Sequence, residues 1–325
     1  MKFLSVLAVF TSVFSSALGA TFTNPLKDPA GSDPFLVFHE GYYYLLTTTW
    51  SDLQITRART LNGLKTGERK VVWSSGDSRR ANVWAPEVHW LNDAWYLYYT
   101  DGSADGNLDN QKTYVRRGGN SPWDNYGERQ LVIGDWAIDS TIVRFNNYGN
   151  YIMWSCIDGG LQSVCAAPLT SPTTIGRRGA ITRPTNSWED DGDFPVNEGP
   201  AAIYKNGRTW ITFSANQCWS PTYQLGILEY IGGDPILASS YRKSGPVFSS
   251  ANGNYGTAHN GFFTSPDGKE IWNIYHATRN SRGACDANRY TMAQKVNWNS
   301  DGTPNFGRAP SLSTVLQGPS GEPAS

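Results

Sequence analysis

"DPFLVFHEGYYYLLTTT", residues 33–49, has a layout that returns four more times along the chain. A polar or small residue is followed by an apolar strand, a turn, and a second strand rich in aromatic residues. The later copies are "APEVHWLNDAWYLYYTD" from Ala85, "DSTIVRFNNYGNYIMWSC" from Asp139, "EGPAAIYKNGRTWITFSA" from Glu198 and "HNGFFTSPDGKEIWNIYHA" from His259. β-branched and aromatic runs separated by Gly- or Asn-containing turns are typical of β-hairpins. The sequence therefore predicts five hairpins of one repeated unit.

The spacing of these segments predicts the fold. They begin 52, 54, 59 and 61 residues apart (85−33, 139−85, 198−139, 259−198). A repeat of this length has room for about four strands, as a propeller blade does. Helical periodicity is nearly absent. We therefore predict an all-β fold, a five-bladed β-propeller, and expect residues 20–325 to form a single catalytic domain because blades bury their faces against their neighbours.

Residues 1–19 have the features of a secretory signal peptide. Lys2 supplies the positive start, Phe3 to Phe14 form a short apolar core, and small residues at Ala17 and Gly19 suit cleavage after Gly19. The apolar core is too short to span a bilayer. We expect a secreted, extracellular protein that is not attached to a membrane.

Composition narrows the range of partners. The net charge is −1, so neither nucleic acid nor an anionic membrane surface is an expected partner. Aromatic residues make up 13% of the chain and charged residues 17%, which suits neutral ligands with apolar faces such as sugars, although core packing explains most aromatic residues equally well. The four cysteines fit no zinc pattern, and in an exported protein one or two disulfides of undetermined pairing are expected. We expect a monomer.

The first residues of the repeats point to a shared polar site. They are Asp33, Ala85, Asp139, Glu198 and His259, so that only Ala85 lacks an ionisable group. In a propeller the innermost strands begin close to the axis, and these side chains would converge there. Any one of them fits an ordinary turn, but three acids and a histidine at equivalent positions are hard to attribute to turn chemistry.

Converging carboxylates raise one another's pKa values, and a glycosidase needs one protonated acid and one ionised base. If the two lie about 6.5–9.5 Å apart, water fits between them and the anomeric configuration inverts, whereas about 5–5.5 Å leads to retention. Starts of non-adjacent inner strands lie across the funnel from one another. This favours the wider gap and an inverting reaction.

An ordered set of motifs adds a family resemblance. The motifs are "GSDPF" at 31–35, "WAPEV" at 84–88, "AIDSTI" at 137–142, "NEGP" at 197–200, "GTAHNG" at 256–261 and "NWNSDGTPNFG" at 297–307. Together they resemble glycoside hydrolase family 43, and within it the α-L-arabinofuranosidases that act on arabinan from its ends. The resemblance implies that Asp33 is the general base, Glu198 the general acid, and Asp139 the carboxylate that raises the pKa of the acid and orients it.

Three further residues are candidates for substrate binding. Arg289 resembles the arginine that holds sugar hydroxyls in this family, with an ordinary salt bridge as the alternative. Trp84 is expected to form a wall of the sugar pocket or to pack in the core, and Trp50 and Trp219 are weaker candidates for the pocket. His259 is expected to bind a water or a cation, to contact substrate, or to have only a structural role at the start of its strand.

No cofactor is expected to be required. A structural calcium ion in the central channel is possible, but the metal ligands are unknown. The segment "GSADGNLDN" at 102–110 resembles an acidic calcium loop only loosely, and its spacing does not match an EF-hand. We interpret it as a surface loop.

The leading functional hypothesis is a secreted, inverting glycosidase of carbohydrate metabolism that releases L-arabinose from the ends of α-1,5-linked plant cell-wall arabinan or arabino-oligosaccharides. A β-xylosidase or an endo-arabinanase of the same fold is the nearest alternative. A sugar-binding propeller without catalysis is the alternative from another class. Lectin-type propellers repeat the same binding residues in each blade, so the unequal set of starting residues favours one catalytic centre.

Overall fold

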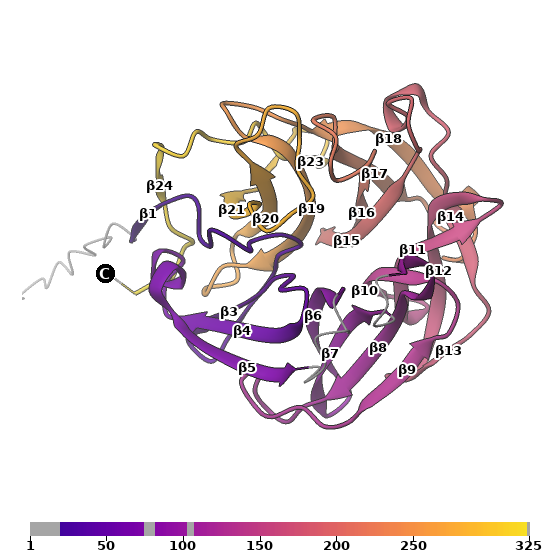
Figure 1. The fold of residues 1–325 in the computed structure, drawn as a ribbon, viewed down its shortest axis with the longest axis horizontal. Coiled ribbons are helices and arrows are strands. Elements are labelled where there is room, and N and C mark those ends of the chain that lie inside the picture. Colours follow the sequence, from indigo (N-terminus) through magenta and orange to yellow (C-terminus); the bar gives the residue numbers. More distant parts are fainter. Residues whose placement is uncertain (1–19, 75–81, 103–106, 324–325) are drawn as a thin grey trace, which may run out of the picture.

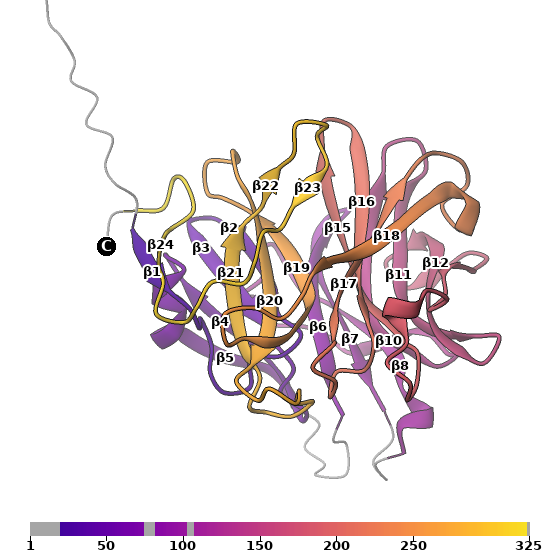
Figure 2. The same cartoon turned by 90° about the horizontal axis from the view of Figure 1, so that it is seen from above.

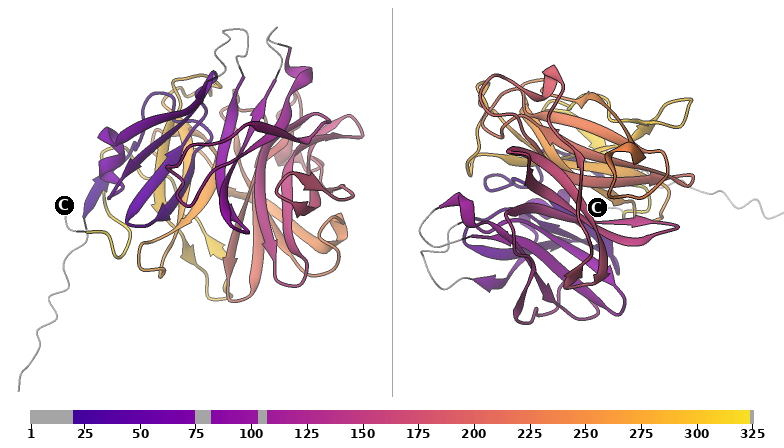
Figure 3. Two further views of the ribbon diagram at one scale, coloured as in Figure 1. Left: turned by 90° about the horizontal axis from the view of Figure 1, so that it is seen from below. Right: turned by 90° about the vertical axis from the view of Figure 1, so that its right-hand side faces the viewer.

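The computed structural model describes residues 20–74, 82–102 and 107–323. Five β-sheets surround a central axis, and the first strand of each sheet lies nearest that axis (Figure 1). From the side, the inner strands run between the two faces of the ring (Figure 2, Figure 3). The prediction of an all-β, five-bladed β-propeller is confirmed.

The blades follow one another along the chain, and all of their strands are antiparallel. Blade 1 contains β2 (Phe35–His39), β3 (Tyr42–Leu46), β4 (Asp52–Ala58) and β5 (Glu68–Ser74). Blade 2 contains β6 (Trp84–Leu91), β7 (Ala94–Asp101), β8 (Lys112–Arg117) and β9 (Arg129–Ile133). Blade 3 contains β10 (Ala137–Phe145), β11 (Gly149–Asp158), β12 (Leu161–Ser171), β13 (Thr174–Ile175) and β14 (Gly179–Thr182), of which the last two both pair with β12.

The last two blades and the connecting elements complete the ring. Blade 4 contains β15 (Asn197–Lys205), β16 (Arg208–Ala215), β17 (Gln224–Tyr230) and β18 (Tyr241–Phe248). Blade 5 contains β19 (Tyr255–Thr264), β20 (Ile271–Thr278) and β21 (Tyr290–Lys295). Outside the blades lie two pairs of short strands, β1 (Thr21–Thr23) with β24 (Val315–Gln317) and β22 (Asn297–Trp298) with β23 (Pro304–Asn305). The 3₁₀ helices are η1 (Asn62–Thr66), η2 (Leu108–Asn110), η3 (Ser187–Glu189) and η4 (Ala238–Ser240).

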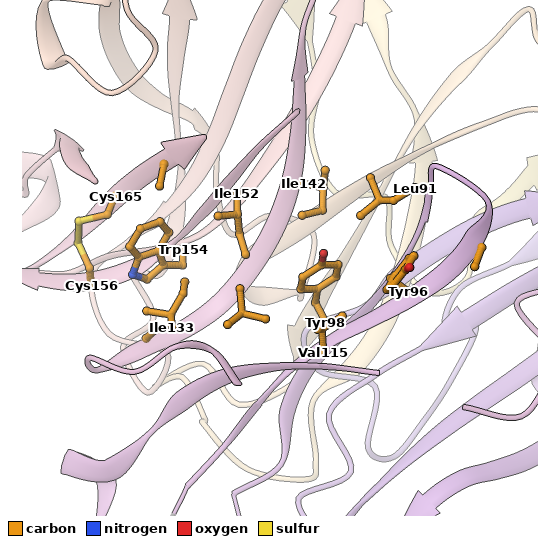
Figure 4. Close-up of a cluster of buried hydrophobic side chains, with 14 residues drawn as sticks. Leu91, Tyr96, Tyr98, Val115, Ile133, Ile142, Ile152, Trp154, Cys156 and Cys165 are labelled. Atoms are coloured by element: carbon orange, nitrogen blue, oxygen red, sulfur yellow. A yellow bond between two sulfur atoms is a disulfide. The ribbon is translucent and has the colours of Figure 1, made fainter. Parts of the chain in front are cut away.

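The buried apolar side chains gather at the seams between blades. Each of the five seams holds one hydrophobic cluster that draws residues from both of its blades. Figure 4 shows the cluster between blades 2 and 3, where Tyr98 of β7 lies beside Ile142 of β10, and Trp154 lies next to the Cys156–Cys165 disulfide. Among the described residues no blade has a separate core, so burial of apolar surface stabilises the ring as a whole.

The N-terminal segment closes the ring. It runs beside β21 and supplies the outer edge that blade 5 lacks, since the Leu26 N–H donates to the Thr291 carbonyl (2.8 Å). Further along, the Gly31 N–H donates to the Arg289 carbonyl (2.9 Å). The strand β1 also pairs with β24, which brings the two ends of the described chain together (Figure 1). This closure carries the chain directly to Asp33, at the entrance to blade 1.

Two disulfides are present, in line with the expectation of one or two. Cys156–Cys165 joins β11 to β12 within blade 3, with its Cα atoms 5.9 Å apart. Cys218–Cys285 joins the loop after β16 to the loop after β20, with its Cα atoms 5.1 Å apart. The second bridge therefore links the rims of blades 4 and 5.

The predicted signal peptide, residues 1–19, lies outside the described residues. Within the described part of the chain, no helix is both long enough and apolar enough to cross a membrane.

Candidate active site

The innermost strands share one unusual backbone position. Four of them contain a β-bulge in the same place, and in all five blades one residue at the inner-strand entrance has positive φ. These residues are Asp33 (51°), Ala85 (43°), Asp139 (59°), Gly199 (54°) and His259 (40°). A left-handed backbone costs an L-residue about 1–2 kcal/mol. Such bulges commonly re-aim a side chain next to a functional site.

Hydrogen bonds between neighbouring blades hold four of these positions. In each case the backbone N–H donates to a side chain near the end of the second strand of the preceding blade. The pairs are Asp33 with His276 Nδ1 (3.1 Å), Ala85 with Thr48 Oγ1 (2.8 Å), Asp139 with Thr100 Oγ1 (3.3 Å) and His259 with Ser214 Oγ (2.8 Å). In blade 4 the Gly199 N–H instead donates to the Asp139 carboxylate. The relative placement of the blades thus sets the geometry at their inner ends.

The structure corrects the register of the fourth repeat. The left-handed residue there is Gly199, so Glu198 stands one position before the residue equivalent to Asp139. The repeat pattern in the sequence predicts that Glu198 is in register with the other starts, and this prediction is wrong by one residue. Measured between left-handed residues, the third and fourth repeats are both 60 residues long (199−139, 259−199). The positions equivalent to Glu198 are held by Trp84 and Ile138 in blades 2 and 3, and both of these side chains line the same cavity.

The six predicted site residues meet at one cavity. Its volume is about 740 Å³, and its lining includes Asp33, Asp139, Glu198, Trp84, His259 and Arg289. The two weaker candidates, Trp50 and Trp219, line it as well. The predicted convergence of three carboxyl groups from blades 1, 3 and 4 is therefore present in the structure.

Asp33 is surrounded by groups that favour its ionised form. Thr48 Oγ1 donates to Asp33 Oδ2 (2.6 Å), and Arg289 Nη1 lies 3.4 Å from Asp33 Oδ1. Burial alone would raise the pKa of Asp33, but the Arg289 guanidinium and the adjacent His259 and His276 hold it well below its usual value. Burial lowers the pKa of both histidines, to about 4 for His276, so at neutral pH they act as polar neighbours and Arg289 is the cation. Asp33 is therefore a carboxylate.

Asp139 and Glu198 have the opposite surroundings. Burial raises the pKa of Asp139 well above its usual value, and repulsion by Glu198 and Asp33 raises it further. Burial likewise raises the pKa of Glu198 to about 7, and the Asp33 charge adds to the effect. Because two adjacent buried carboxylates rarely ionise together, we treat them as a pair that holds a proton near neutral pH.

Two neutral side chains that the sequence analysis missed hold Glu198. Gln162 Nε2 donates to Glu198 Oε2 (2.7 Å), and the Tyr223 hydroxyl donates to Glu198 Oε1 (2.8 Å). Burial raises the pKa of Tyr223 well above its usual value, so its hydroxyl keeps its proton. Gln162 lies on β12 and Tyr223 just before β17, outside the hairpin segments on which the repeat analysis depended.

His276 was also missed, although the repeats contain a signal for it. In each quoted segment a polar residue lies near, or just after, the end of the second strand. These residues are Thr48, Thr100, Ser155, Ser214 and His276. Four of them accept the blade-to-blade hydrogen bonds described above. A comparison of strand ends as well as strand starts would have indicated that His276 belongs to the site.

The three predicted substrate-binding residues lie in different surroundings. Arg289 pairs with Asp33, so the salt bridge is present, and it also lines the cavity; its contact with sugar hydroxyls stays a prediction. His259 Nδ1 lies 3.3 Å from Asp33 Oδ1 and 3.8 Å from Asp139 Oδ2, between two of the acids. Trp84 meets Trp50 edge to face, with ring centroids 5.8 Å apart, and the two indoles form one wall of the cavity.

The residues present give little support to a calcium site. No group of three or more His, Cys, Asp or Glu side chains among the described residues is arranged to hold a metal ion. Calcium takes six to eight oxygen ligands, and His259 would contribute only one ring nitrogen. The central cation stays a prediction, and no chemical step below depends on it.

The loop at 102–110 is described only in part, because residues 103–106 lie outside the described chain. Its last residues form η2, where the Asn107 side chain accepts a hydrogen bond from the Asp109 N–H (2.9 Å). Leu108 and Asp109 line the edge of the cavity. The described part therefore borders the site, which the interpretation as a plain surface loop did not anticipate.

This arrangement suits acid–base chemistry on a neutral ligand. A carboxylate fixed by a cation and a carboxyl group with a raised pKa enter the same well from blades 1 and 4. Apolar and aromatic side chains form much of the remaining lining. One group can accept a proton while the other donates one, which is the division of roles that hydrolysis of a glycosidic bond requires.

Comparisons with known proteins point the same way. The chain matches the family model of glycosyl hydrolases family 43 over residues 22–304. It is 36% identical over 309 residues to an extracellular exo-α-(1→5)-L-arabinofuranosidase of Streptomyces avermitilis, covering 88% of this chain and 63% of that protein. It is 32% identical over 329 residues to α-L-arabinofuranosidase 43 of Humicola insolens, covering 91% of this chain and 68% of the relative. The chain thus spans about two thirds of the length of these relatives.

A solved structure agrees in fold over nearly its whole length. The crystal structure of an α-L-arabinofuranosidase from Lactobacillus brevis superposes with a TM-score of 0.81 at 28% identity. The match covers 90% of this chain and 98% of that one. Family model, relatives and structure agree with the motifs found in the sequence, and this chain belongs to glycosyl hydrolase family 43.

Proposed function

We propose that this protein is a secreted, exo-acting α-L-arabinofuranosidase that releases L-arabinose from the ends of α-1,5-linked arabinan or arabino-oligosaccharides with inversion of configuration. We further propose that it acts outside the cell, as a monomer, and without a cofactor. The name of the Streptomyces avermitilis relative supports the substrate and the extracellular site of action.

One observation carries the proposal. Asp33 and Glu198 line the same cavity, and their surroundings shift their pKa values in opposite directions. At neutral pH the well therefore offers a base from blade 1 and an acid from blade 4. Family membership accounts for the chemistry, and the opposed pKa shifts of Asp33 and Glu198 support the proposed roles of base and acid.

In the proposed reaction, a terminal arabinofuranosyl unit occupies the well. The Asp33 carboxylate removes a proton from a water molecule as the water oxygen attacks the anomeric carbon. Glu198 donates its proton to the glycosidic oxygen as the bond from that oxygen to the anomeric carbon breaks. The products are free arabinose and a shortened chain. Asp33 is left protonated and Glu198 ionised, and exchange with solvent restores both.

The other polar residues act on these two carboxyl groups or on the sugar. We assign to Asp139 the role of raising the pKa of Glu198, because two neighbouring carboxyl groups resist ionising together, and Asp139 also accepts a hydrogen bond from the Gly199 N–H at the strand entrance beside Glu198. Arg289 keeps Asp33 ionised and offers its remaining N–H groups to sugar hydroxyls. His259 lies between Asp33 and Asp139, where its ring can orient either carboxylate or a bound water.

The proposal is tested by the product and by its anomeric form. We expect linear α-1,5-arabino-oligosaccharides to yield arabinose from the first turnover, with the β-anomer appearing first in proton NMR spectra. Early α-anomer would contradict inversion, and early release of internal oligosaccharides would indicate an endo-arabinanase. Release of xylose from xylo-oligosaccharides alone would indicate a β-xylosidase. Binding of arabino-oligosaccharides without cleavage would indicate a non-catalytic propeller.

A further inference from the structure

Exposed apolar side chains gather at the mouth of the site. Twelve large hydrophobic residues of the described chain are exposed, and four of them line the cavity that contains the three acids. These four are Leu108, Ile157, Phe194 and Trp219. The most exposed is Trp219, with 54% of its surface open to solvent. Apolar surface concentrated around a functional cavity is typical of a surface that a ligand covers.

The loop that carries Trp219 is firmly held although its indole is exposed. The neighbouring residue Cys218 forms the disulfide to Cys285, which anchors this loop of blade 4 to blade 5. Gly283 of the same blade 5 loop packs so closely that a Cβ at that position would lie 2.3 Å from the Trp219 carbonyl oxygen. The backbone around the indole is therefore fixed before any ligand arrives, which reduces the entropy lost on binding.

A second aromatic loop is tied to the first. The Gln217 side-chain amide donates to the Phe194 carbonyl oxygen. Thr222 Oγ1 also donates to Asp191 Oδ2 (3.2 Å), so the loop that carries Trp219 is connected at both ends to the segment that carries Phe194. Phe194 has 40% of its surface exposed. The two rings thus belong to one braced part of the blade 4 rim.

This part of the rim lies next to the proposed acid. Phe194 precedes Glu198 by four residues in the same segment, and the Asn216 N–H donates to the Val196 carbonyl (3.2 Å) between the two loops. Trp50 of blade 1 and Trp84 of blade 2 lie on the opposite side of the well. Asp33 stands at the entrance to blade 1, so these two indoles are on the side of the proposed base. A general acid faces the leaving group of the substrate. The rim beside Glu198 therefore borders the sugar that departs.

We infer that Trp219 and Phe194 form the subsite for the leaving-group sugar, the unit that follows the scissile bond. The ligand is a second neutral arabinofuranosyl ring, whose apolar face covers the indole while its hydroxyls stay in water. This inference rests on the proposed function, because it takes Glu198 as the acid. It makes the blade 4 rim the determinant of preference for oligosaccharide over short substrates.

The inference is tested by binding to an inactive enzyme. In the Glu198→Gln background, Trp219→Ala should weaken the binding of α-1,5-arabinotriose by about ten-fold, as expected for an aromatic anchor, and leave the binding of arabinose within about two-fold. Calorimetry measures both affinities. Trp90→Ala is the matched control, since Trp90 is also an exposed tryptophan but lines a separate cavity. It should change neither affinity.

The outcomes are distinguishable. Unchanged arabinotriose affinity in Trp219→Ala, or equal losses for the trisaccharide and the monosaccharide, would overturn the subsite. Trp219→Phe should recover most of the affinity, which excludes damage to the fold as the cause of a loss, and failure of this rescue would also count against the subsite. If the enzyme with Glu198 intact releases no arabinose from arabinotriose, the proposed function fails instead.

Discussion

The two sides of the well are buried alike but keep their carboxyl groups in different states. On the side formed by blades 1 and 5, Asp33 lies beside the Arg289 guanidinium and accepts a hydrogen bond from Thr48. On the side formed by blades 3 and 4, the hydrogen-bond donors to Glu198 are the neutral side chains of Gln162 and Tyr223, and a second acid, Asp139, interacts with it electrostatically. Burial raises the pKa of a carboxyl group on either side. The difference lies in the neighbours.

A single cation is the main cause of the difference. Arg289 immediately precedes β21 of the last blade, and the segment that closes the ring holds its carbonyl through Gly31. The closure of the propeller therefore brings a fixed positive charge to Asp33 from a residue more than 250 positions away in sequence. Among the described residues Glu198 forms no ion pair; Arg289 also lowers the pKa of Glu198, but this effect is smaller than the rise caused by burial. The ring topology, rather than the local sequence around either acid, decides which of them holds a proton.

The largest expected effect is a loss of activity on removal of either carboxyl group. The base and the acid can be told apart because only the loss of the acid should depend on the leaving group of the substrate. Asp33→Asn should lower kcat/KM by about 10²–10⁴ on every substrate, because water activation is always needed. Glu198→Gln should cause a similar loss on arabino-oligosaccharides. The loss should be much smaller on an aryl arabinofuranoside with a good leaving group, which departs without a proton. Steady-state kinetics on the two substrate types measures the contrast.

A surface residue provides the control for this comparison. Glu68→Gln makes the same chemical change on an outer strand of blade 1, where Glu68 pairs with Arg57 and is 61% exposed. It should leave both activities within about two-fold, since exposed ion pairs contribute little. Equal losses of activity on the two substrates in Glu198→Gln would show that Glu198 is not the general acid. The two sides of the well would then not differ in the way proposed.

The second effect is on pH dependence. Asp33 must be ionised, so activity should be lost only as the pH falls through its depressed pKa. Glu198 must be protonated, so activity should be lost as the pH rises through its pKa of about 7. The kcat/KM profile should therefore have an acid limb well below the usual range of Asp and a basic limb near neutrality.

Tyr223→Phe should shift only the basic limb of the pH profile of kcat/KM. The hydroxyl of Tyr223 donates to Glu198 and favours its ionised form. Without it the pKa of Glu198 rises further, and the basic limb should shift upward by about one pH unit, while the acid limb stays in place. A parallel shift of both limbs, or a downward shift of the basic limb, would contradict the assignment of that limb to Glu198.

Much of this architecture could be predicted from the sequence, because each blade repeats its own signals. The hairpin segments from Asp33 to His259 indicated five blades, and their starting residues indicated the well. These signals are local, since turn chemistry and alternating apolar residues need only a few neighbouring positions. The resemblance in six short motifs then indicated the family.

The part that could not be predicted depends on backbone geometry and on long-range pairing. The register error at Glu198 arose because an extra bulge residue is not visible as a gap in one sequence, and only the positive φ of Gly199 reveals it. Gln162 and Tyr223 lie outside the repeated hairpins, so no pattern connected them with Glu198. Arg289 was identified by resemblance, but its pairing with Asp33 depends on how the ring closes.

The smallest expected effect on activity is at Thr48. Its side chain contacts Asp33 and also connects blade 1 to blade 2. Its hydroxyl donates to Asp33 Oδ2 (2.6 Å) and accepts from the Ala85 N–H (2.8 Å). In Thr48→Val the pKa of Asp33 should rise, so the acid limb should move upward by less than about one pH unit, because Arg289 remains. The rate near neutral pH should change by no more than about three-fold.

The same substitution should also destabilise the ring, because Ala85 would keep its left-handed backbone with an unpaired N–H. Leaving a buried donor unpaired costs about 1–3 kcal/mol, and chemical denaturation of Thr48→Val measures this loss. Thr48→Ser keeps the hydroxyl and should restore both the acid limb and most of the stability. If Thr48→Val shifts the acid limb as far as Arg289→Met does, then hydrogen bonding rather than the guanidinium charge keeps Asp33 ionised, and the contrast between the two sides of the well would need a different cause.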